Sequence, residues 1–269
     1  MSANDSTKKT LLVALLLCVV CSVMVSSAAV LLKEPQEINK SLDKKKNILK
    51  AAGLYSENIN IEQVFKTIEA KVVNVKTGEY VDSVEPQGLD EKKAAKDPSR
   101  NITLKSKNDL ANIKRISQYY VVYLVKDEGK ISKIILPVNG KGLWSTLYGF
   151  VAIDRDMNTI KGLTFYEHAE TPGLGGEVDN PSWKAQWPGK KVYSEDNNVQ
   201  IQLIKGKVDK ASTPDAEHKV DGLAGATLTS NGVTNLMKFW MGENGFGKYI
   251  NRMRKELNSN QPIDEGKEG

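Results

Sequence analysis

The feature that most constrains this chain is an uncharged, apolar run from Leu11 to Leu32. Lys8 and Lys9 precede the run, and Lys33 follows it. Because about 20 apolar residues cross the hydrocarbon core of a bilayer, the run predicts a transmembrane helix. Any water-soluble domain must then be built from the residues that follow.

The run also allows two other interpretations. Ser26 to Ala28 resembles the small-residue cleavage site of a signal peptide, but the apolar residues continue to Leu32, so the run is longer than the usual apolar region of such a peptide. A lipid anchor on Cys18 or Cys21 is weaker, since a bulky residue precedes each cysteine. We favour a retained anchor, with cleavage as the alternative.

The charges that flank the run leave its orientation open. Two lysines precede the run and five follow it between residues 33 and 46. By the positive-inside rule, this excess weakly places the large domain in the cytoplasm. The rule describes short loops better than large translocated domains.

Composition excludes several classes of function. The 269-residue chain is mildly basic, with a net charge of +5, but its lysines are not interleaved with aromatic residues as on a nucleic-acid surface. Both cysteines lie in the apolar run, so the soluble part cannot hold a disulfide or a cysteine-ligated iron–sulfur cluster. The two histidines have no ligand-spaced neighbours, and no metal site is expected. Any redox chemistry must therefore use an organic cofactor.

The hydrophobic pattern predicts an α+β fold, in which helices pack on an antiparallel sheet. β-Branched and aromatic segments separated by turns predict a four-stranded meander, and Gln200 to Ile204 predicts a further strand. Apolar spacing predicts an amphipathic helix from Ile61 to Val72 and a last helix from Phe246 to Met253, with a polar surface loop over 84–109. The meander strands are expected at 119–125, 131–138, 146–153 and 160–166.

We therefore expect five regions along the chain. They are an N-terminal tail (1–10), a transmembrane helix (11–32), a polar stalk with a short helix (33–55), the folded domain (56–257) and a disordered tail (258–269).

A segment from Asp221 to Ser230 combines small residues with hydroxyls. Small side chains at 224–226 allow close approach to the backbone, and Thr227, Thr229 and Ser230 follow. We expect Ser230 or Asn231 to cap a helix whose free N–H groups point back at these hydroxyls, which favours a phosphate beside Thr229. A plain turn before a capped helix is the alternative. The expected apolar stripe of the helix is Val233, Leu236, Met237, Trp240 and Met241.

A second unusual segment, Glu167 to Gly176, follows the fourth predicted strand. Its glycines and proline predict an irregular loop that can lie flat against a ring, with Leu174 as the one large apolar side chain at its centre. A simple glycine-rich turn is the alternative. His168 and Glu170 are expected to be partly exposed, with no role in proton transfer.

Asp221 to Thr229 resembles the flavinylation motif of the FMN-binding domain family, Asp-x-x-(Ser/Thr)-Gly-Ala-Thr-x-Thr, with Ala224 at the Ser/Thr position. Three other segments match the same family in order and spacing. They are Gly142 to Ser145, Glu170 to Glu177, and Asn180 to Trp183. The resemblance is nearest to the flavinylated subunits of sodium-pumping NADH:quinone reductases, and the flavin subunits of Rnf-type complexes are the alternative.

The resemblance implies FMN attached by a phosphoester to Thr229. No base adjoins Thr229 in sequence, so self-attachment is not expected. The resemblance implies a separate FMN transferase that uses FAD. Trp144 fits a buried core residue equally well. No catalytic residue is expected, and the expected cofactor-binding residues are Thr229, Thr227, Gly225, Ala226, Asp221, Thr171, Leu174, Gly175, Trp144 and Ser145.

The resemblance further implies a protein that relays electrons within a sodium-pumping NADH:quinone oxidoreductase of a bacterial inner membrane, with its domain in the periplasm. The implied partners are the other subunits, the transferase and membrane lipid. No Gly-x-Gly-x-x-Gly follows a strand, so NADH oxidation belongs to another subunit and no complete activity is expected from this chain.

The apolar run carries only Ser and Cys as polar residues, too few for a sodium path. A non-redox, membrane-tethered binding module is the alternative class, whereas the lack of Gly-x-Ser-x-Gly argues against a hydrolase.

Overall fold

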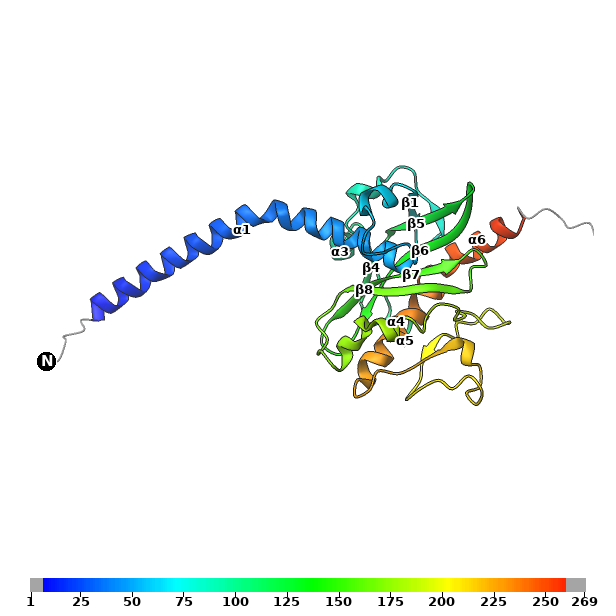
Figure 1. The fold of residues 1–269 in the computed structure, drawn as a ribbon. Helices are drawn as coiled ribbons and strands as arrows, with labels where there is room; N and C mark the ends of the chain where they lie inside the picture. Colours follow the sequence, from blue (N-terminus) through cyan, green and yellow to red (C-terminus); the bar gives the residue numbers. More distant parts are fainter. Residues whose placement is uncertain (1–6, 260–269) are drawn as a thin grey trace, which may run out of the picture. The chain divides into compact units, whose positions relative to one another are not determined.

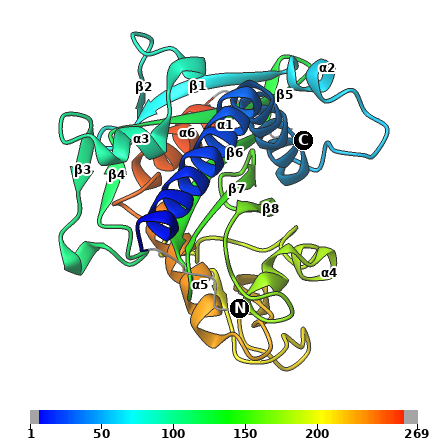
Figure 2. The same ribbon diagram turned by 90° about the vertical axis from the view of Figure 1, so that its left-hand side faces the viewer.

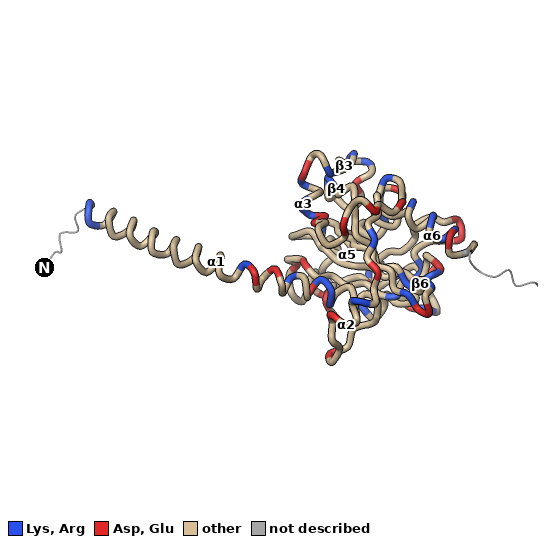
Figure 3. Tube along the Cα trace, turned by 90° about the horizontal axis from the view of Figure 1, so that it is seen from above, with Lys and Arg blue, Asp and Glu red and all other residues tan. Residues whose placement is uncertain are grey.

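The structure is a computed structural model that describes residues 7–259. The chain divides into two compact units, Met1–Lys44 and Lys45–Gly269. The first unit is built from most of α1 (Thr7–Ala51), a 45-residue helix with Pro35 inside it. Figure 3 shows the uncharged part of α1 as an unbroken tan stretch between its flanking lysines. By length and composition, α1 is able to cross a membrane.

The helix continues through most of the segment expected to be a stalk. Residues 33–51 are helical, so the expected short helix is the direct continuation of the apolar one. The last turn of α1 belongs to the second unit, where Ile48 and Leu49 are buried. Thr164 donates a hydrogen bond from its hydroxyl to the carbonyl oxygen of Asn47 (3.2 Å). The end of the helix is thus part of the packed domain.

A six-stranded sheet, in which every neighbouring pair is antiparallel, forms the centre of the second unit (Figure 1). The strand order is β2-β1-β5-β6-β7-β8. The four predicted meander strands are confirmed as β5 to β8, and the predicted α+β class is confirmed. The bounds are β1 Ile68–Asn74, β2 Glu79–Tyr80, β5 Tyr119–Asp127, β6 Lys130–Lys141, β7 Thr146–Asp154 and β8 Ile160–Glu167.

Two helices cover one face of the sheet, and the end of α1 packs on the other. α5 (Thr227–Met241) and α6 (Gly247–Ser259) belong to the larger hydrophobic cluster, whereas Ile48 and Leu49 belong to the smaller one. Alternate residues of β7 divide between the clusters: Val151 faces α5 and Phe150 faces α1. The predicted apolar stripe of α5 is confirmed, because its five residues are all fully buried.

The helix expected from Ile61 to Val72 is wrong in its second half. α2 (Ile61–Phe65) ends after five residues, and β1 follows. β1 pairs with β5 over seven residues, from Ile68 opposite Val125 to Asn74 opposite Tyr119. Sheet pairing therefore outweighs the helical spacing, which the β-branched residues of this segment satisfy only by coincidence.

Three further expectations need correction. The strand expected at 200–204 is shorter, and its pairing is parallel and lies outside the main sheet: β9 (Gln202–Leu203) pairs with β10 (Lys219–Val220). The expected loop at 84–109 instead folds into short elements, which Figure 2 shows beside β4 (Arg115–Ser117). These are η1 Pro86–Gly88, α3 Glu91–Lys96, β3 Asn101–Thr103 and η2 Ser106–Asn108. Disorder is expected from residue 258, but α6 continues to Ser259. Residues 260–269 lie outside the described part of the chain.

Three short helical segments complete the domain. They are η3 Gly175–Asp179, α4 Pro181–Lys184 and η4 Ala216–His218.

Candidate functional site

The candidate site centres on a hydrogen bond between two residues that lie far apart in the sequence. The Thr229 hydroxyl donates to Oε2 of Glu170 over 2.7 Å. Both side chains are buried, with exposed fractions of 0% for Thr229 and 5% for Glu170. α5 supplies the threonine, and the segment after β8 supplies the carboxylate. The fold therefore brings the two motifs identified in the sequence into direct contact.

The same carboxylate binds a third segment through its backbone. The N–H groups of Leu143, Trp144 and Ser145 donate to Glu170 over 3.1, 3.0 and 3.1 Å. Burial by itself raises the pKa of Glu170, but the hydrogen bonds from the Thr229 hydroxyl and these three N–H groups outweigh it and hold the pKa below its ordinary value. Glu170 is therefore an ionised, buried acceptor at neutral pH.

The expectation that Glu170 is partly exposed is therefore wrong. His168 contributes to its placement, since its Nδ1 accepts a hydrogen bond from the Glu170 N–H (3.2 Å) while its Nε2 lies 2.8 Å from the Asp179 carboxylate. A glutamate followed by a Thr-Pro-Gly-Leu-Gly-Gly loop carries little signal of burial. The sequence signal for burial was Gly142 and Gly175. Their role becomes evident only in the fold, where both lie against the Glu170 side chain.

Glycines at two positions make the close approach of these segments feasible. A Cβ at Gly175 would lie 2.6 Å from Thr229 Oγ1 and 2.8 Å from Glu170 Oε2. A Cβ at Gly142 would lie 2.6 Å from Glu170 Oε1. Contacts this short exclude any larger residue unless the loops move.

α5 begins earlier than expected. Its first residue is Thr227 and its N-cap is Ala226, so neither Ser230 nor Asn231 is the cap. Ser230 is instead buried in the first turn, where its hydroxyl accepts from the Leu223 N–H (2.9 Å). Ala226 has no side-chain oxygen to cap the helix. Because the first N–H groups of a helix need acceptors, this uncapped turn is suited to an anion beside Thr229.

Exposed apolar residues adjoin the buried pair in each of the three segments that meet there. Leu143 and Trp144 extend from the loop bound by Glu170, Leu228 adjoins Thr229, and Leu174 adjoins Gly175. We call these four residues the apolar rim. Their exposed fractions are 41% for Leu143, 66% for Trp144, 43% for Leu174 and 60% for Leu228. Among the described residues beyond α1, Leu110 is the remaining large hydrophobic side chain with comparable exposure. Such a gathering indicates a surface that another group covers.

The rim decides between the two interpretations of Trp144, because a side chain that is 66% exposed is not a core residue. Ser145 also lies at the site: its N–H binds Glu170, and its Oγ accepts from the Ala169 N–H (2.7 Å). Thr171 and Thr227 are exposed within the same two segments. Gly225 has a φ of +70° and lies against Leu174, since a Cβ there would meet Leu174 Cδ2 at 2.9 Å.

Asp221 is engaged elsewhere. Its carboxylate accepts hydrogen bonds from the Val208 N–H (2.7 Å) and from Gln186 Nε2 (3.2 Å). Its carbonyl oxygen accepts from the indole N–H of Trp183 (3.0 Å). These bonds fix the segment that leads into the motif, so Asp221 positions the site from outside.

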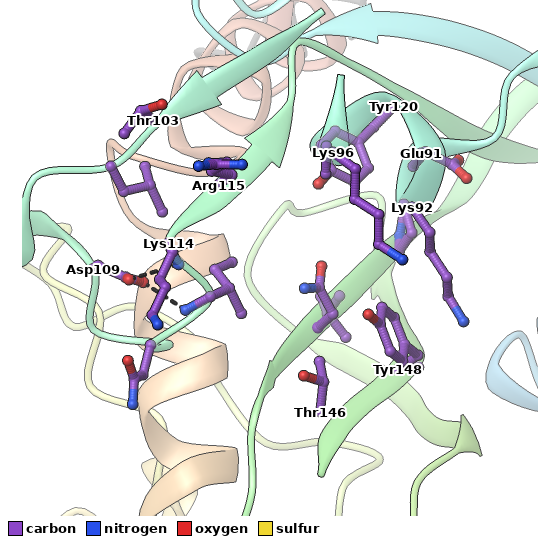
Figure 4. Close-up of a pocket in the computed structure, with 18 of the residues that line it drawn as sticks. Glu91, Lys92, Lys96, Thr103, Asp109, Lys114, Arg115, Tyr120, Thr146 and Tyr148 are labelled. Carbon is purple, nitrogen blue, oxygen red and sulfur yellow. Dashed lines mark hydrogen bonds between the residues drawn. The ribbon is translucent and has the colours of Figure 1, made fainter. Parts of the chain in front are cut away.

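A separate cavity of about 710 Å³ contains none of the predicted site residues (Figure 4). It opens where β6 leaves β5, since the pairing of these strands ends at Tyr123 opposite Ile135. Lys92, Lys96 and Arg115 extend around it. Lys92 also forms an ion pair with Glu167 (2.6 Å) and lies over the Tyr148 ring (3.7 Å to its centroid). The cavity is therefore basic and aromatic but does not reach the Glu170–Thr229 pair.

Comparison with known proteins assigns the chain to a family. The family model of the FMN-binding domain matches residues 142–242, a range that includes Glu170 and Thr229. The C subunit of the Na+-translocating NADH-quinone reductase of Pseudomonas aeruginosa is 51% identical over 259 residues, covering 95% of this chain and 99% of the relative. The chain belongs to this family of C subunits. The corresponding protein of Haemophilus ducreyi is 48% identical and covers 96% of this chain and 98% of its own length.

Solved structures of C subunits share the fold. The crystal structure of Shewanella oneidensis NqrC superposes with a TM-score of 0.74 at 36% identity, and covers 81% of this chain and 99% of that one. The C subunit from Parabacteroides distasonis gives a TM-score of 0.63 at 27% identity, over 81% of this chain and 96% of that one. The near full-length matches favour the C subunits over the Rnf-type alternative.

Proposed function

We propose that this member of the C-subunit family carries FMN through a phosphoester on Thr229 and relays electrons within a membrane-bound, sodium-translocating NADH:quinone reductase. The observation that carries the proposal is the buried Thr229 hydroxyl in an uncapped first helical turn, adjoined by the apolar rim, inside the segment that matches the FMN-binding domain.

The residues around Thr229 fit the two chemically different ends of FMN. A phosphate would be favoured by the free N–H groups at the start of α5. A planar, largely apolar ring would be favoured by the apolar rim, of which Trp144 offers an aromatic face. When bound, FMN supplies one-electron chemistry, which the protein side chains themselves lack. A covalent tether prevents loss of the cofactor by making its re-binding intramolecular.

The remaining assignments extend the proposal. The apolar part of α1 anchors the chain in lipid, and the other subunits supply NADH oxidation and quinone reduction. A separate FMN transferase attaches the flavin.

The domain lies on the periplasmic side of the inner membrane. Protease added to spheroplasts should then degrade the domain, and a domain that stays protected until the membrane is lysed would place it in the cytoplasm.

The attachment is tested with a matched pair of variants expressed together with the transferase. Thr229→Val removes the proposed acceptor hydroxyl. On a denaturing gel under ultraviolet light, the band of this variant should not fluoresce. Thr234→Val removes another hydroxyl of α5, which accepts a hydrogen bond from Leu203, and should leave the fluorescence unchanged. Fluorescence that persists in Thr229→Val would refute attachment at this residue.

A further inference from the structure

The proposed attachment raises a chemical problem that the structure addresses. A threonine hydroxyl is a weak nucleophile and needs a group that accepts its proton. No base adjoins Thr229 in sequence, but Glu170, 59 positions earlier, accepts its hydrogen bond (2.7 Å). This distance lies within the range required of a general base.

We propose that Glu170 is the proton acceptor and positioning group for flavin attachment, so that this chain brings its own base to the transferase. The inference rests on the proposed function. The Thr229 Oγ1–phosphorus bond forms while the phosphorus–oxygen bond of the pyrophosphate in FAD breaks. AMP leaves with the electron pair, and the hydroxyl proton passes to Glu170 and then to water.

The contacts of Glu170 hold its carboxylate in the position that this role needs. Three backbone N–H groups from 143–145 fix its position independently of Thr229. They also stabilise its charged form, so the carboxylate carries no proton at neutral pH and its Oε2 is open to the proton of Thr229. Its hydrogen bond with Thr229 orients the threonine hydroxyl, so the hydroxyl loses less rotational freedom in the reaction.

The burial of Thr229 adds a second requirement. With an exposed fraction of 0%, the hydroxyl cannot meet an external phosphate until its cover moves. The loop before η3 packs against the hydroxyl, since a Cβ at Gly175 would lie 2.6 Å from Thr229 Oγ1, and Gly173 in the same loop has a φ of +75°. Glu170 precedes this loop and is tied to 143–145, so the cover can shift while the Glu170–Thr229 bond persists.

The test measures initial rates of flavin attachment to the full-length chain in detergent, with purified transferase and FAD, between pH 6 and 9. Glu170→Gln keeps the size of the side chain but not its charge. We expect a rate about 100-fold lower at pH 7, the low end for loss of a general base. We also expect this rate to rise with pH, because hydroxide must replace the carboxylate, whereas the wild-type rate stays flat. Glu167→Gln, which removes an exposed carboxylate at the end of β8, should match the wild type.

Melting curves of the unmodified chains reveal any misfolding of Glu170→Gln, and a second variant disturbs the Glu170–Thr229 pair without a change of charge. Gly175→Ala keeps every charge but places a methyl group 2.6 Å from Thr229 Oγ1, and should also slow attachment at least tenfold. Gly176→Ala is the neighbouring control, since its Cβ would meet only the backbone of its own loop at 3.0 Å or more.

The inference is overturned if Glu170→Gln reacts within twofold of the wild type, or reacts slowly with an unchanged pH profile, which would indicate recognition or folding alone. Failure of the wild type to gain flavin at Thr229 would instead refute the proposed function, so the two failures are distinguishable.

Discussion

At the residue scale, the site depends on one ionised carboxylate that joins three segments. Glu170 receives hydrogen bonds from the Thr229 hydroxyl and from the backbone of the 143–145 loop. A single substitution at this position therefore affects both the Thr229 hydroxyl and the loop that carries Trp144. Because all four of these groups donate to its oxygens, Glu170 stabilises the fold most strongly while it is charged.

Glu170 should make the unmodified chain sensitive to acid. Its pKa is lower in the folded state than its ordinary value of 4.5, so its contribution to stability is complete above about pH 4.5 and is lost as the pH falls through the lowered pKa. Melting temperatures measured from pH 7 to pH 3 should fall less steeply for Glu170→Gln than for the wild type. Identical slopes would show that the carboxylate gains nothing from these contacts.

Trp144 should matter to the flavin more than to the fold. Since its side chain is 66% exposed, Trp144→Ala should change the free energy of unfolding by no more than about 0.5 kcal/mol. The visible absorption band of the attached flavin should nevertheless shift, as a neighbouring ring is removed. A loss of stability of roughly 2 kcal/mol or more in denaturant titrations would show that Trp144 is a packing residue instead.

At the scale of elements, close contacts between helices and the sheet position the site. A Cβ at Gly140 of β6 would lie 2.8 Å from Leu236 Cβ of α5, and one at Gly232 of α5 would lie 2.4 Å from the Lys141 carbonyl oxygen. α5 is therefore set directly against the end of β6, from which the 142–145 loop departs. These contacts fix the distance between Thr229 and the Glu170-binding loop.

The last turn of α1 should be sensitive to its contact with β8. A Cβ at Gly162 would lie 2.4 Å from the Ala51 carbonyl oxygen, so Gly162→Ala should destabilise the domain by about 1–3 kcal/mol. Gly88→Ala is the control, because nothing lies within 4 Å of its Cβ position. Equal unfolding midpoints for the two variants would contradict the packing described for α1.

Local pattern predicted some elements and misjudged others for identifiable reasons. The meander was predictable because its strands are long and apolar, and the stripe of α5 because its spacing is helical over two turns. The segment from Ile68 to Val72 was not, since its pairing partner, β5, lies some 50 residues later. Glu170 escaped detection for the same reason: its burial depends on Thr229 and on the 143–145 loop, which only the tertiary fold brings together.

At the scale of the whole molecule, the proposed anchor and the folded domain are separable in sequence. The buried residues of α1 are Asn47, Ile48, Leu49 and Ala51, all near its C-terminal end. Removal of residues 1–32 should therefore release the chain from membranes and leave its melting temperature within a few degrees of the full-length value. Aggregation or loss of the cooperative transition would mean that the apolar part of α1 supports the fold.

The central claim is that Thr229 carries FMN, and the mass of the intact chain tests it most directly. In cells that contain the transferase, the full-length protein should be heavier than its sequence by the mass of one FMN group joined through its phosphate. Fragmentation should assign the added mass to Thr229, and Thr229→Val should have the mass of its sequence alone. An unmodified wild-type mass, or an added group on another residue, would contradict the account.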